Sequence, residues 1–562
     1  MRSLLRRVQE DATRVTTDDA SPVLGELVAG DAPPAVEPPR SADPLDLSLP
    51  AMSDAGRRRT GWRWFPVLFP TVTFALFMAV VLPIAWRLAP RPGRPASEAM
   101  AWKLFLVVAS YVFYAAWDWR FVPLLMLSTV GNEVAAMGIH LARDRAARDR
   151  WLTGALIGNL GVLVWFKYAG FLAGSADGLL RLVGLELDVP YPEVVLPVGI
   201  SFFTFQAISY VVDVHRGRLR PTHLLDVAVY LAFFPQLVAG PIVRAGEFLP
   251  QLAVGPDPRG VPVGRALRLI WIGLVLKVVV ANHLAEELVD PLFATPGRYG
   301  GGQTLLGIYA YAVQIYADFA GYTSIAIGVA LLLGFEFPAN FDRPYAARSL
   351  QEFWRRWHMT LSRWLRDYLY IPLGGSAGSA RRTQRNLLLT MLLGGLWHGA
   401  AWTFVVWGGL HGLGLVVERR RQARIEAASA QGDPDPAYDG RAHLIPPGPT
   451  PRPLHPLTGW LITFHLVCLG WVFFRAPSFE VALAVLGGLF GGRSEVPLAP
   501  TVVLLVAVVL LTQQLGDRPR AWLRDSWDTL PVPLHVATFA LVLVVLDVFG
   551  PDGAAPFIYF QF

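Results

Sequence analysis

Long apolar segments follow one another from residue 65 almost to the C-terminus, and this succession limits what the chain can fold into. A helix that crosses a bilayer needs about 20 mostly apolar residues. Some segments are short and others are long enough for two elements. We therefore predict an all-α polytopic integral membrane protein with about eleven transmembrane helices plus re-entrant and interfacial helices. The segments span residues 65–88, 101–117, 120–142, 152–173, 194–213, 224–243, 266–282, 303–334, 386–417, 458–474, 500–515 and 533–550.

The composition agrees with a membrane protein. Charged residues make up only 16% of the chain, against about a quarter in soluble globular proteins. The 562 residues are enough for several soluble domains, but they carry too little charge to cover the surfaces of such domains. The basic residues are almost all arginine, with lysine only at Lys103, Lys167 and Lys277. In a membrane chain, basic residues commonly fill cytoplasmic loops or contact lipid head groups, so we expect membrane lipid and no nucleic acid as a partner.

Polar segments divide the chain. Residues 1–60 are rich in Pro, Asp, Glu and Ser and lack hydrophobic periodicity, so we predict a disordered polar N-terminal tail. Residues 61–562 form one predicted membrane domain, interrupted by a polar loop at 418–457. The single cysteine, Cys468, excludes an internal disulfide and a cysteine-rich metal site, and we expect no metal.

His398 lies in the run LLTMLLGGLWHGAAWTFVVWGGLHG (388–412), which contains no charged residue. A neutral imidazole can act as a general base near neutral pH. The alternative is a histidine that only bonds a neighbouring helix. His411 lies thirteen residues further on, and one straight helix would place it about 20 Å along the axis and on another face, so we give it a secondary role. Three glycines leave room for a substrate or another backbone: Gly394, Gly395 and Gly399.

Residues 349–375 are predicted to form one amphipathic helix. At about 100° per residue, four arginines share one arc, and the large apolar side chains lie on the opposite arc. This pattern is typical of a helix in the membrane interface. The arginines either hold an anionic acyl donor or only anchor the helix on lipid phosphates, and His358 is expected to point into the membrane core beside His398. The arginines are Arg355, Arg356, Arg363 and Arg366.

Asp318 is an acid within an apolar stretch, flanked by Tyr316 and Tyr322. Ionisable residues at bilayer depth usually mark function or a satisfied internal partner. Asp318 could therefore orient a histidine, or it could form a structural pair with a buried arginine.

Several catalytic motifs are absent from the sequence. There is no Walker A motif, which argues against ATP-driven transport. There is neither a G-x-S-x-G nor an H-E-x-x-H motif, so serine nucleophiles and zinc hydrolysis are not supported.

Eight stretches of the chain resemble the membrane-bound O-acyltransferases (MBOAT), in the bacterial branch of alginate O-acetylation and D-alanyl-transfer proteins. The two most specific stretches contain the histidines: FWRRWHMTLSRWLRDYLYIPLGG (353–375) and RNLLLTMLLGGLWHGAAWTFVVWGGLHG (385–412). Together the eight stretches cover most of residues 65–562. The other six are ASYVFYAAWDWRF (109–121), PVGISFFTFQAISYVVDVHRG (197–217), FFPQLVAGPIVR (233–244), ADFAGYTSIAIG (317–328), LGWVFFRA (469–476) and PFIYFQF (556–562).

This resemblance implies an MBOAT-like helical bundle that transfers an acyl group to a hydroxyl within a funnel through the membrane. It implies that His398 in the Trp-His-Gly motif is the catalytic histidine and that His358 is a second functional position. We add Trp397, Asp318 and His411 as supporting residues. The donor would be acetyl-CoA or another acyl thioester from the cytoplasm. In this branch, extracytoplasmic partner proteins pass the acyl group to a cell-surface polymer, which implies a multi-pass protein of the bacterial inner membrane.

The sequence therefore predicts a membrane-embedded O-acyltransferase that moves acetyl from acetyl-CoA toward hydroxyls of a cell-surface polysaccharide, as in alginate-type O-acetylation. His398 is the expected general base, and no bound cofactor is expected. One alternative is a membrane transporter or export component, although the predicted spans are nearly free of acids. The other is acylation of a lipid or small metabolite by the same site.

Overall fold

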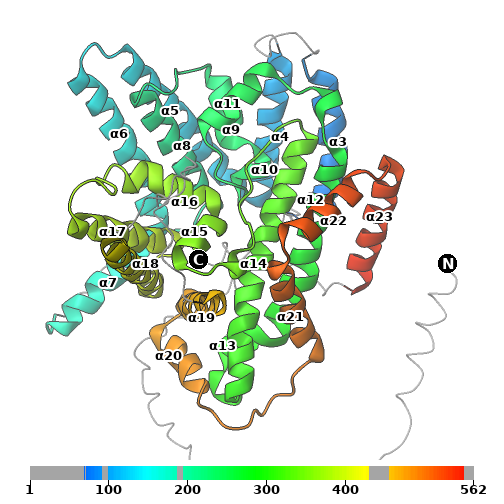
Figure 1. Cartoon of the computed structure of the whole chain (residues 1–562). Coiled ribbons are helices and arrows are strands. Elements are labelled where there is room, and N and C mark those ends of the chain that lie inside the picture. The colour runs from blue at the N-terminus through cyan, green and yellow to red at the C-terminus, as the bar shows by residue number, and fades with distance from the viewer. Residues whose placement is uncertain (1–68, 70, 91–98, 186–193, 430–454, 550–562) are drawn as a thin grey trace, which may run out of the picture. The chain divides into compact units, whose positions relative to one another are not determined.

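The computed structural model describes residues 69, 71–90, 99–185, 194–429 and 455–549. These residues form helices and connections without any β-strand, as the sequence predicts (Figure 1). The predicted N-terminal tail, residues 1–60, lies outside the described residues.

Three kinds of helix make up the described part of the chain. The α-helices are α3 (Val72–Leu88), α4 (Met100–Asp118), α5 (Val122–Leu141), α6 (Arg145–Leu163), α7 (Ala169–Leu182), α8 (Ile200–His215), α9 (Leu224–Ala232), α10 (Phe234–Leu237), α11 (Ala245–Val254), α12 (Val263–Leu274), α13 (Asp290–Ala294), α14 (Gly301–Leu332), α15 (Leu350–Arg356), α16 (Met359–Leu365), α17 (Ala380–His398), α18 (Trp402–Ser429), α19 (Pro456–Arg475), α20 (Phe479–Gly488), α21 (Pro500–Gln514), α22 (Asp517–Asp528) and α23 (Val532–Phe549). The π-helices are η3 (Val164–Tyr168), η5 (Val275–Asn282), η6 (Ala285–Val289) and η9 (Arg366–Tyr370). The 3₁₀ turns are η2 (Trp119–Phe121), η4 (Pro258–Gly260), η7 (Pro296–Arg298) and η8 (Pro344–Ala346).

Four helical segments among the described residues are long and apolar enough to cross a membrane. They are Met100–Leu141, Arg145–Leu182, Gly301–Leu332 and Pro456–Arg475. The chain bends by 101° at the break between helices α21 and α22. The two helices would make a fifth span if they form one broken transmembrane element. The fold is thus an all-helical bundle of a multi-pass membrane protein. The predicted number of about eleven spans is not confirmed, because other apolar segments form shorter helices, such as α3 and α20.

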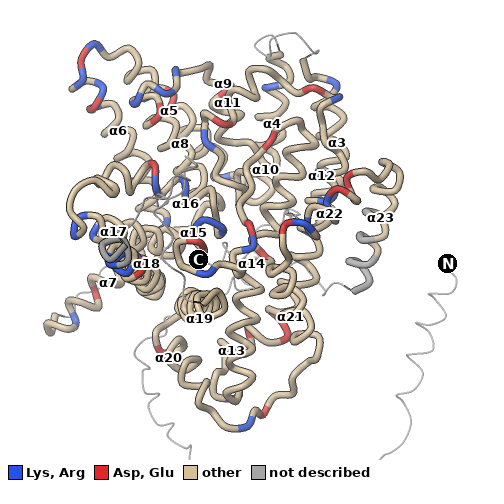
Figure 2. The backbone as a smooth tube through the Cα atoms, in the orientation of Figure 1, with Lys and Arg blue, Asp and Glu red and all other residues tan. Residues whose placement is uncertain are grey.

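Helix α14 is the most deeply buried of these candidate spans, with 83% of its apolar window inside the protein. It packs backbone to backbone against α12: a Cβ atom on Gly273 would lie 2.5 Å from the carbonyl oxygen of Gly321. Small residues allow such close approach of helices. Lys, Arg, Asp and Glu lie mostly at helix ends and in connections (Figure 2). The sequence of α14 contains a single acid, Asp318.

Helices α17 and α18 form an antiparallel hairpin joined by residues 399–401, not one continuous helix through 388–412. Their backbones touch, because a Cβ atom on Gly395 would lie 2.3 Å from the carbonyl oxygen of Phe404, and one on Gly408 equally close to that of Met391. The sequence interpretation that Gly395 admits another backbone is therefore confirmed. The hairpin places His398 at its tip.

The segment 349–375 is broken, so the prediction of one amphipathic helix is wrong. Helix α15 ends at Arg356, α16 begins at Met359, and His358 between them has a left-handed backbone with φ 41°. Hydrogen bonds from a distant segment hold the break: the Asp342 N–H donates to the Arg356 carbonyl (2.9 Å) and the Met359 N–H to the Asn340 carbonyl (3.0 Å). The predicted apolar arc is largely buried, as its hydrophobicity requires. Tyr368 is half-buried, and the other large side chains of the arc are buried: Trp354, Trp357, Leu361, Trp364 and Leu365.

Helices extend into the predicted polar loop at 418–457 from both sides. Helix α18 continues through Glu418 to Ser429, and α19 begins at Pro456. Residues 430–454 of the loop lie outside the described residues. The first part of the predicted loop is helical because Glu, Arg, Gln and Ala, which dominate it, are strong helix formers.

Candidate active site

The structure brings His358 and His398 together in the protein interior. Their ring centroids lie 6.4 Å apart, and the two residues are 0% and 2% exposed. Trp397 lies beside both rings, at 4.9 Å from His398 and 6.1 Å from His358. Trp407 and Phe474 also lie against His398, with ring centroids at 5.1 and 5.3 Å. The sequence prediction that the two histidines are neighbours agrees with this geometry.

Asn340 determines which nitrogen of His358 carries a proton. The backbone N–H of Thr360 donates to Asn340 Oδ1 (3.2 Å), and the Thr360 hydroxyl lies 2.9 Å from the same oxygen. An N–H group can only donate, so this side-chain atom of Asn340 is assigned as the oxygen. His358 Nδ1, 3.1 Å from it, must then carry a hydrogen and donate. Nε2 of the neutral ring is left as an acceptor, and it is buried without a hydrogen-bond partner among the described residues.

Lys167 and Tyr168 hold the end of α17 at His398. Lys167 Nζ donates to the carbonyl oxygens of Trp397 (2.6 Å) and His398 (3.0 Å), and the Tyr168 hydroxyl donates to that of Leu396 (2.8 Å). A helix leaves its last carbonyls without intrahelical partners, and these two side chains supply them. Both residues end η3, a π-helix, and such turns often occur at functional sites. This contact was not predicted from the sequence, where the only signal was that lysine is so rare in the chain.

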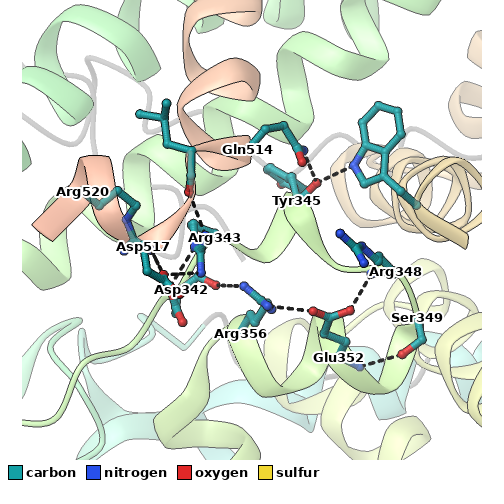
Figure 3. A network of polar contacts seen from close by, with 12 residues as sticks. Asp342, Arg343, Tyr345, Arg348, Ser349, Glu352, Arg356, Gln514, Asp517 and Arg520 are labelled. Carbon is teal, nitrogen blue, oxygen red and sulfur yellow. Dashed lines mark hydrogen bonds and ion pairs between the residues drawn. The ribbon is translucent and has the colours of Figure 1, made fainter. Parts of the chain in front are cut away.

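Arg356 belongs to a polar network next to the break at His358 (Figure 3), whereas Nε of the neighbouring Arg355 is buried without a hydrogen-bond partner among the described residues. Arg356 pairs with Glu352 at 2.7 Å and donates to the carbonyl oxygen of Asp342 at 3.3 Å. Burial lowers the pKa of the Arg355 guanidinium, although the charges of Glu352 and Glu418 partly oppose this. Glu418 also accepts hydrogen bonds from the first N–H groups of α15, those of Leu350 and Gln351.

The same network reaches the bend between α21 and α22. Arg343 has a left-handed backbone with φ 49° and, with His358, is one of two such non-glycine residues among those described. Its side chain donates to the Leu515 carbonyl (2.7 Å) and pairs with Asp517 (2.9 Å), as Figure 3 shows. Non-glycine residues in this conformation persist only where surrounding contacts impose it. The polar network thus supports the segment that carries Asn340.

Arg363 and Arg366 lie in a different group, because the break separates their helix from α15. Arg363 pairs with Glu247 (3.0 Å), and Arg366 pairs with Asp367 (2.5 Å). Burial alone would raise the pKa of Asp367, but the hydrogen bond from Arg366 and the charges of Arg244 and Arg366 lower it. The four predicted arginines therefore form two groups instead of one arc.

Among the described residues, the ion-pair partner of Asp318 is Lys277 of η5, whereas the sequence led us to expect an arginine or a histidine. Both side chains are 3% exposed. The next residue, Phe319, lies edge-on against His358 at 4.6 Å. The ion pair therefore fixes the part of α14 that forms one wall of the site.

His411 lies close to His398 but does not touch it. The ring of Trp407 separates them, at 5.1 Å from His398 and 4.9 Å from His411. The hairpin brings the two histidines closer than the straight helix assumed from the sequence. Phe353 and Trp354 enclose the other side of the His411 ring.

Comparison with known proteins identifies the family. Residues 200–434, which contain both histidines, match the model of the membrane-bound O-acyltransferase family. Over 506 residues the chain is 36% identical to a probable alginate O-acetylase AlgI of Azotobacter vinelandii, an alignment that covers 83% of this chain and 96% of that protein. The chain belongs to the membrane-bound O-acyltransferase (MBOAT) family.

Two further relatives agree with this MBOAT assignment. A probable alginate O-acetylase AlgI of Pseudomonas aeruginosa is 43% identical over 450 residues, covering 80% of this chain and 76% of the relative. A peptidoglycan O-acetyltransferase of Helicobacter pylori is 36% identical over 458 residues, with 76% and 81% covered. The protein is therefore an O-acyltransferase of the MBOAT type, with several membrane-spanning helices.

Proposed function

We propose that this enzyme transfers acetyl from acetyl-CoA toward hydroxyls of a cell-surface polysaccharide, as in alginate-type O-acetylation. The observation that carries the proposal is the buried pair of imidazoles, His358 and His398, with ring centroids 6.4 Å apart. The names of the relatives support the acyl group and the acceptor, because they are two alginate O-acetylases and one peptidoglycan O-acetyltransferase.

In this proposal His398 is the general base. Its ring takes the proton of the acceptor hydroxyl while the oxygen attacks the carbonyl carbon of the thioester. A carbon–oxygen bond forms and the carbon–sulfur bond breaks. The CoA thiolate then takes the proton from the imidazolium, which leaves an acetyl ester, free CoA thiol and a neutral histidine.

His358 has a narrower role than the sequence allowed. Its Nδ1 hydrogen is directed at Asn340, so Nε2 offers a lone pair and no proton. A lone pair can accept a hydrogen bond from the acceptor hydroxyl or from the neighbouring imidazole, whereas it cannot donate one to a developing oxyanion. We therefore assign His358 to orienting the acceptor or the base.

We infer further that the enzyme lies in the bacterial inner membrane, takes its donor from the cytoplasm and works with extracytoplasmic acetyl-carrier or polymer-modifying proteins. The expected count of about eleven spans is kept as part of this proposal. Membership of an acyltransferase family argues against the transporter alternative. The other alternative is that the same site acylates a lipid or small metabolite, and the experiment below distinguishes this acceptor from a polymer.

The test is transfer of radiolabelled acetyl from acetyl-CoA by membranes that contain the protein and its partners. Replacement of His398 by alanine should lower transfer about 10²–10⁴-fold, because that is the usual contribution of a general base. Replacement of the exposed His465 by alanine is the matched control and should leave transfer unchanged. Wild-type transfer by His398→Ala would contradict the assignment, and label in the lipid extract rather than in the polymer would point to the alternative acceptor.

A further inference from the structure

An aromatic ring from outside the α17–α18 hairpin lies against the imidazole of His398. It is that of Phe474, near the end of α19, which meets the imidazole edge-on with the ring centroids 5.3 Å apart. Phe474 is 1% exposed, and the proposed chemistry gives it no role. Trp397 and Trp407 lie against the same imidazole at 4.9 and 5.1 Å. Three large rings therefore crowd the group that would receive the proton.

The ring of Phe474 is held in place by three other aromatic side chains. Phe404, Trp407 and Trp471 lie edge-on to it, at 4.8, 5.2 and 5.2 Å between ring centroids. Phe404 is itself confined, since a Cβ atom on Gly399 would lie 2.0 Å from its ring. Protein interiors are close-packed, so a ring enclosed in this way moves only if its neighbours also move. Phe474 is therefore a fixed wall beside the catalytic imidazole.

The backbone that carries Phe474 is tied to another helix by the next residue. Arg475 Nη2 lies 2.7 Å from Asp290 Oδ1, and its guanidinium lies over the ring of Phe293 at 5.3 Å. Both partners belong to α13. The end of α19 is thus positioned by contacts outside the hairpin that carries His398, and Phe474 can be replaced without changing a residue of that hairpin.

We propose that Phe474 limits the acyl group of the donor to a short chain and so selects acetyl over butyryl and longer groups. The thioester carbonyl must come within reach of the hydroxyl whose proton His398 takes, so the acyl chain begins beside this imidazole. Each further methylene then needs space that the surrounding rings occupy, and forcing methylenes into packed surroundings is unfavourable. The inference rests on the proposed thioester donor, and it names a residue that selects among thioesters.

The test compares acetyl-CoA with butyryl-CoA as donors for the full-length protein, reconstituted in vesicles with its partners. The wild type should prefer acetyl-CoA at least about a hundredfold in kcat/KM, because butyryl is two methylenes longer and each is worth about 10–200-fold in an apolar site. Phe474→Ala should lower this preference at least about tenfold by raising kcat/KM for butyryl-CoA. A general loss of structure would lower transfer from both donors and leave their ratio unchanged.

Phe473→Ala is the matched control, because this neighbouring ring is half-buried and packs against Phe479 of α20. Its ratio of kcat/KM for the two donors should equal that of the wild type. Phe474→Leu is the second variant in case the alanine variant fails to fold, since it leaves a smaller gap. It should shift the ratio in the same direction by a smaller factor.

Equal use of acetyl-CoA and butyryl-CoA by the wild type would overturn the inference without any variant, and it would leave the proposed acyl transfer intact. An unchanged ratio in the two Phe474 variants, or an equal change in Phe473→Ala, would also overturn it. Transfer from neither thioester in the presence of the partners would instead refute the proposed donor, and this inference with it.

Discussion

Lys167 Nζ lies 3.0 Å from the carbonyl oxygen of His398, across 231 positions of the chain. Lys167→Met should leave the carbonyls of Trp397 and His398 without their donor, at a cost of about 1–3 kcal/mol for a buried group. We expect kcat to fall at least about tenfold with little change in KM, because the lysine positions the catalytic backbone without touching substrate. Steady-state acetyl transfer in reconstituted vesicles measures both constants.

Tyr168→Phe is the control for this lysine, since it removes one hydrogen bond to the preceding carbonyl, that of Leu396. Its effect on kcat should be smaller. Full kcat in Lys167→Met would show that the end of α17 needs no support from η3.

Asn340→Ala should lower acetyl transfer by about tenfold or more, because the Nδ1 hydrogen of His358 would lose its acceptor and the ring could take either tautomer. Thr360→Val removes only the hydroxyl on the other side of the same oxygen and should have a smaller effect. The measurement is the acetyl transfer rate of each variant, normalised to the amount of protein inserted in the membrane. Equal losses in the two variants would mean that the loop as a whole, and not the tautomer, is what matters.

Gly408→Ala should destabilise the α17–α18 hairpin, because the new Cβ would lie 2.3 Å from the Met391 carbonyl oxygen. Overpacking of this kind typically costs about 1–3 kcal/mol. The neighbouring Gly409→Ala would meet nothing closer than a leucine methyl at 3.6 Å and should be tolerated. Melting temperatures of the two purified variants provide the comparison, and similar values would contradict the close contact of the two backbones.

The buried pair Lys277–Asp318 should be sensitive to removal of one partner and tolerant of removal of both. Asp318→Asn leaves an ammonium without its anion, and breaking such a pair costs about 3–5 kcal/mol. The double variant Lys277→Met with Asp318→Leu should recover much of this loss, since apolar replacements of buried pairs are often neutral. Thermal unfolding of the purified proteins tests this expectation; a double variant less stable than Asp318→Asn would overturn it.

The membrane class and the helical fold could be predicted because each depends on local composition. The meeting of His358 with His398 could be expected because each lies in a motif that resembles the MBOAT family. The break at His358 could not, because no glycine or proline marks it and the hydrogen bonds that hold it come from Asn340 and Asp342. Lys167 escaped prediction for a similar reason, since its partner lies more than 200 residues away. The arginine arc failed because it assumed one continuous helix.

The position of His398 at the end of α17 has an electrostatic consequence. A helix carries about half a negative charge at its C-terminus, and a cation there is stabilised by about 0.3–1 kcal/mol, or up to about 2 kcal/mol when partly buried. The imidazolium formed during acetyl transfer would lie at this end of a 19-residue helix dipole. Lys167 donates hydrogen bonds to the last two carbonyl groups at this end, those of Trp397 and His398. The carbonyl end of α17 therefore favours the imidazolium while it exists, and the hydrogen bonds from Lys167 take up part of the same negative potential.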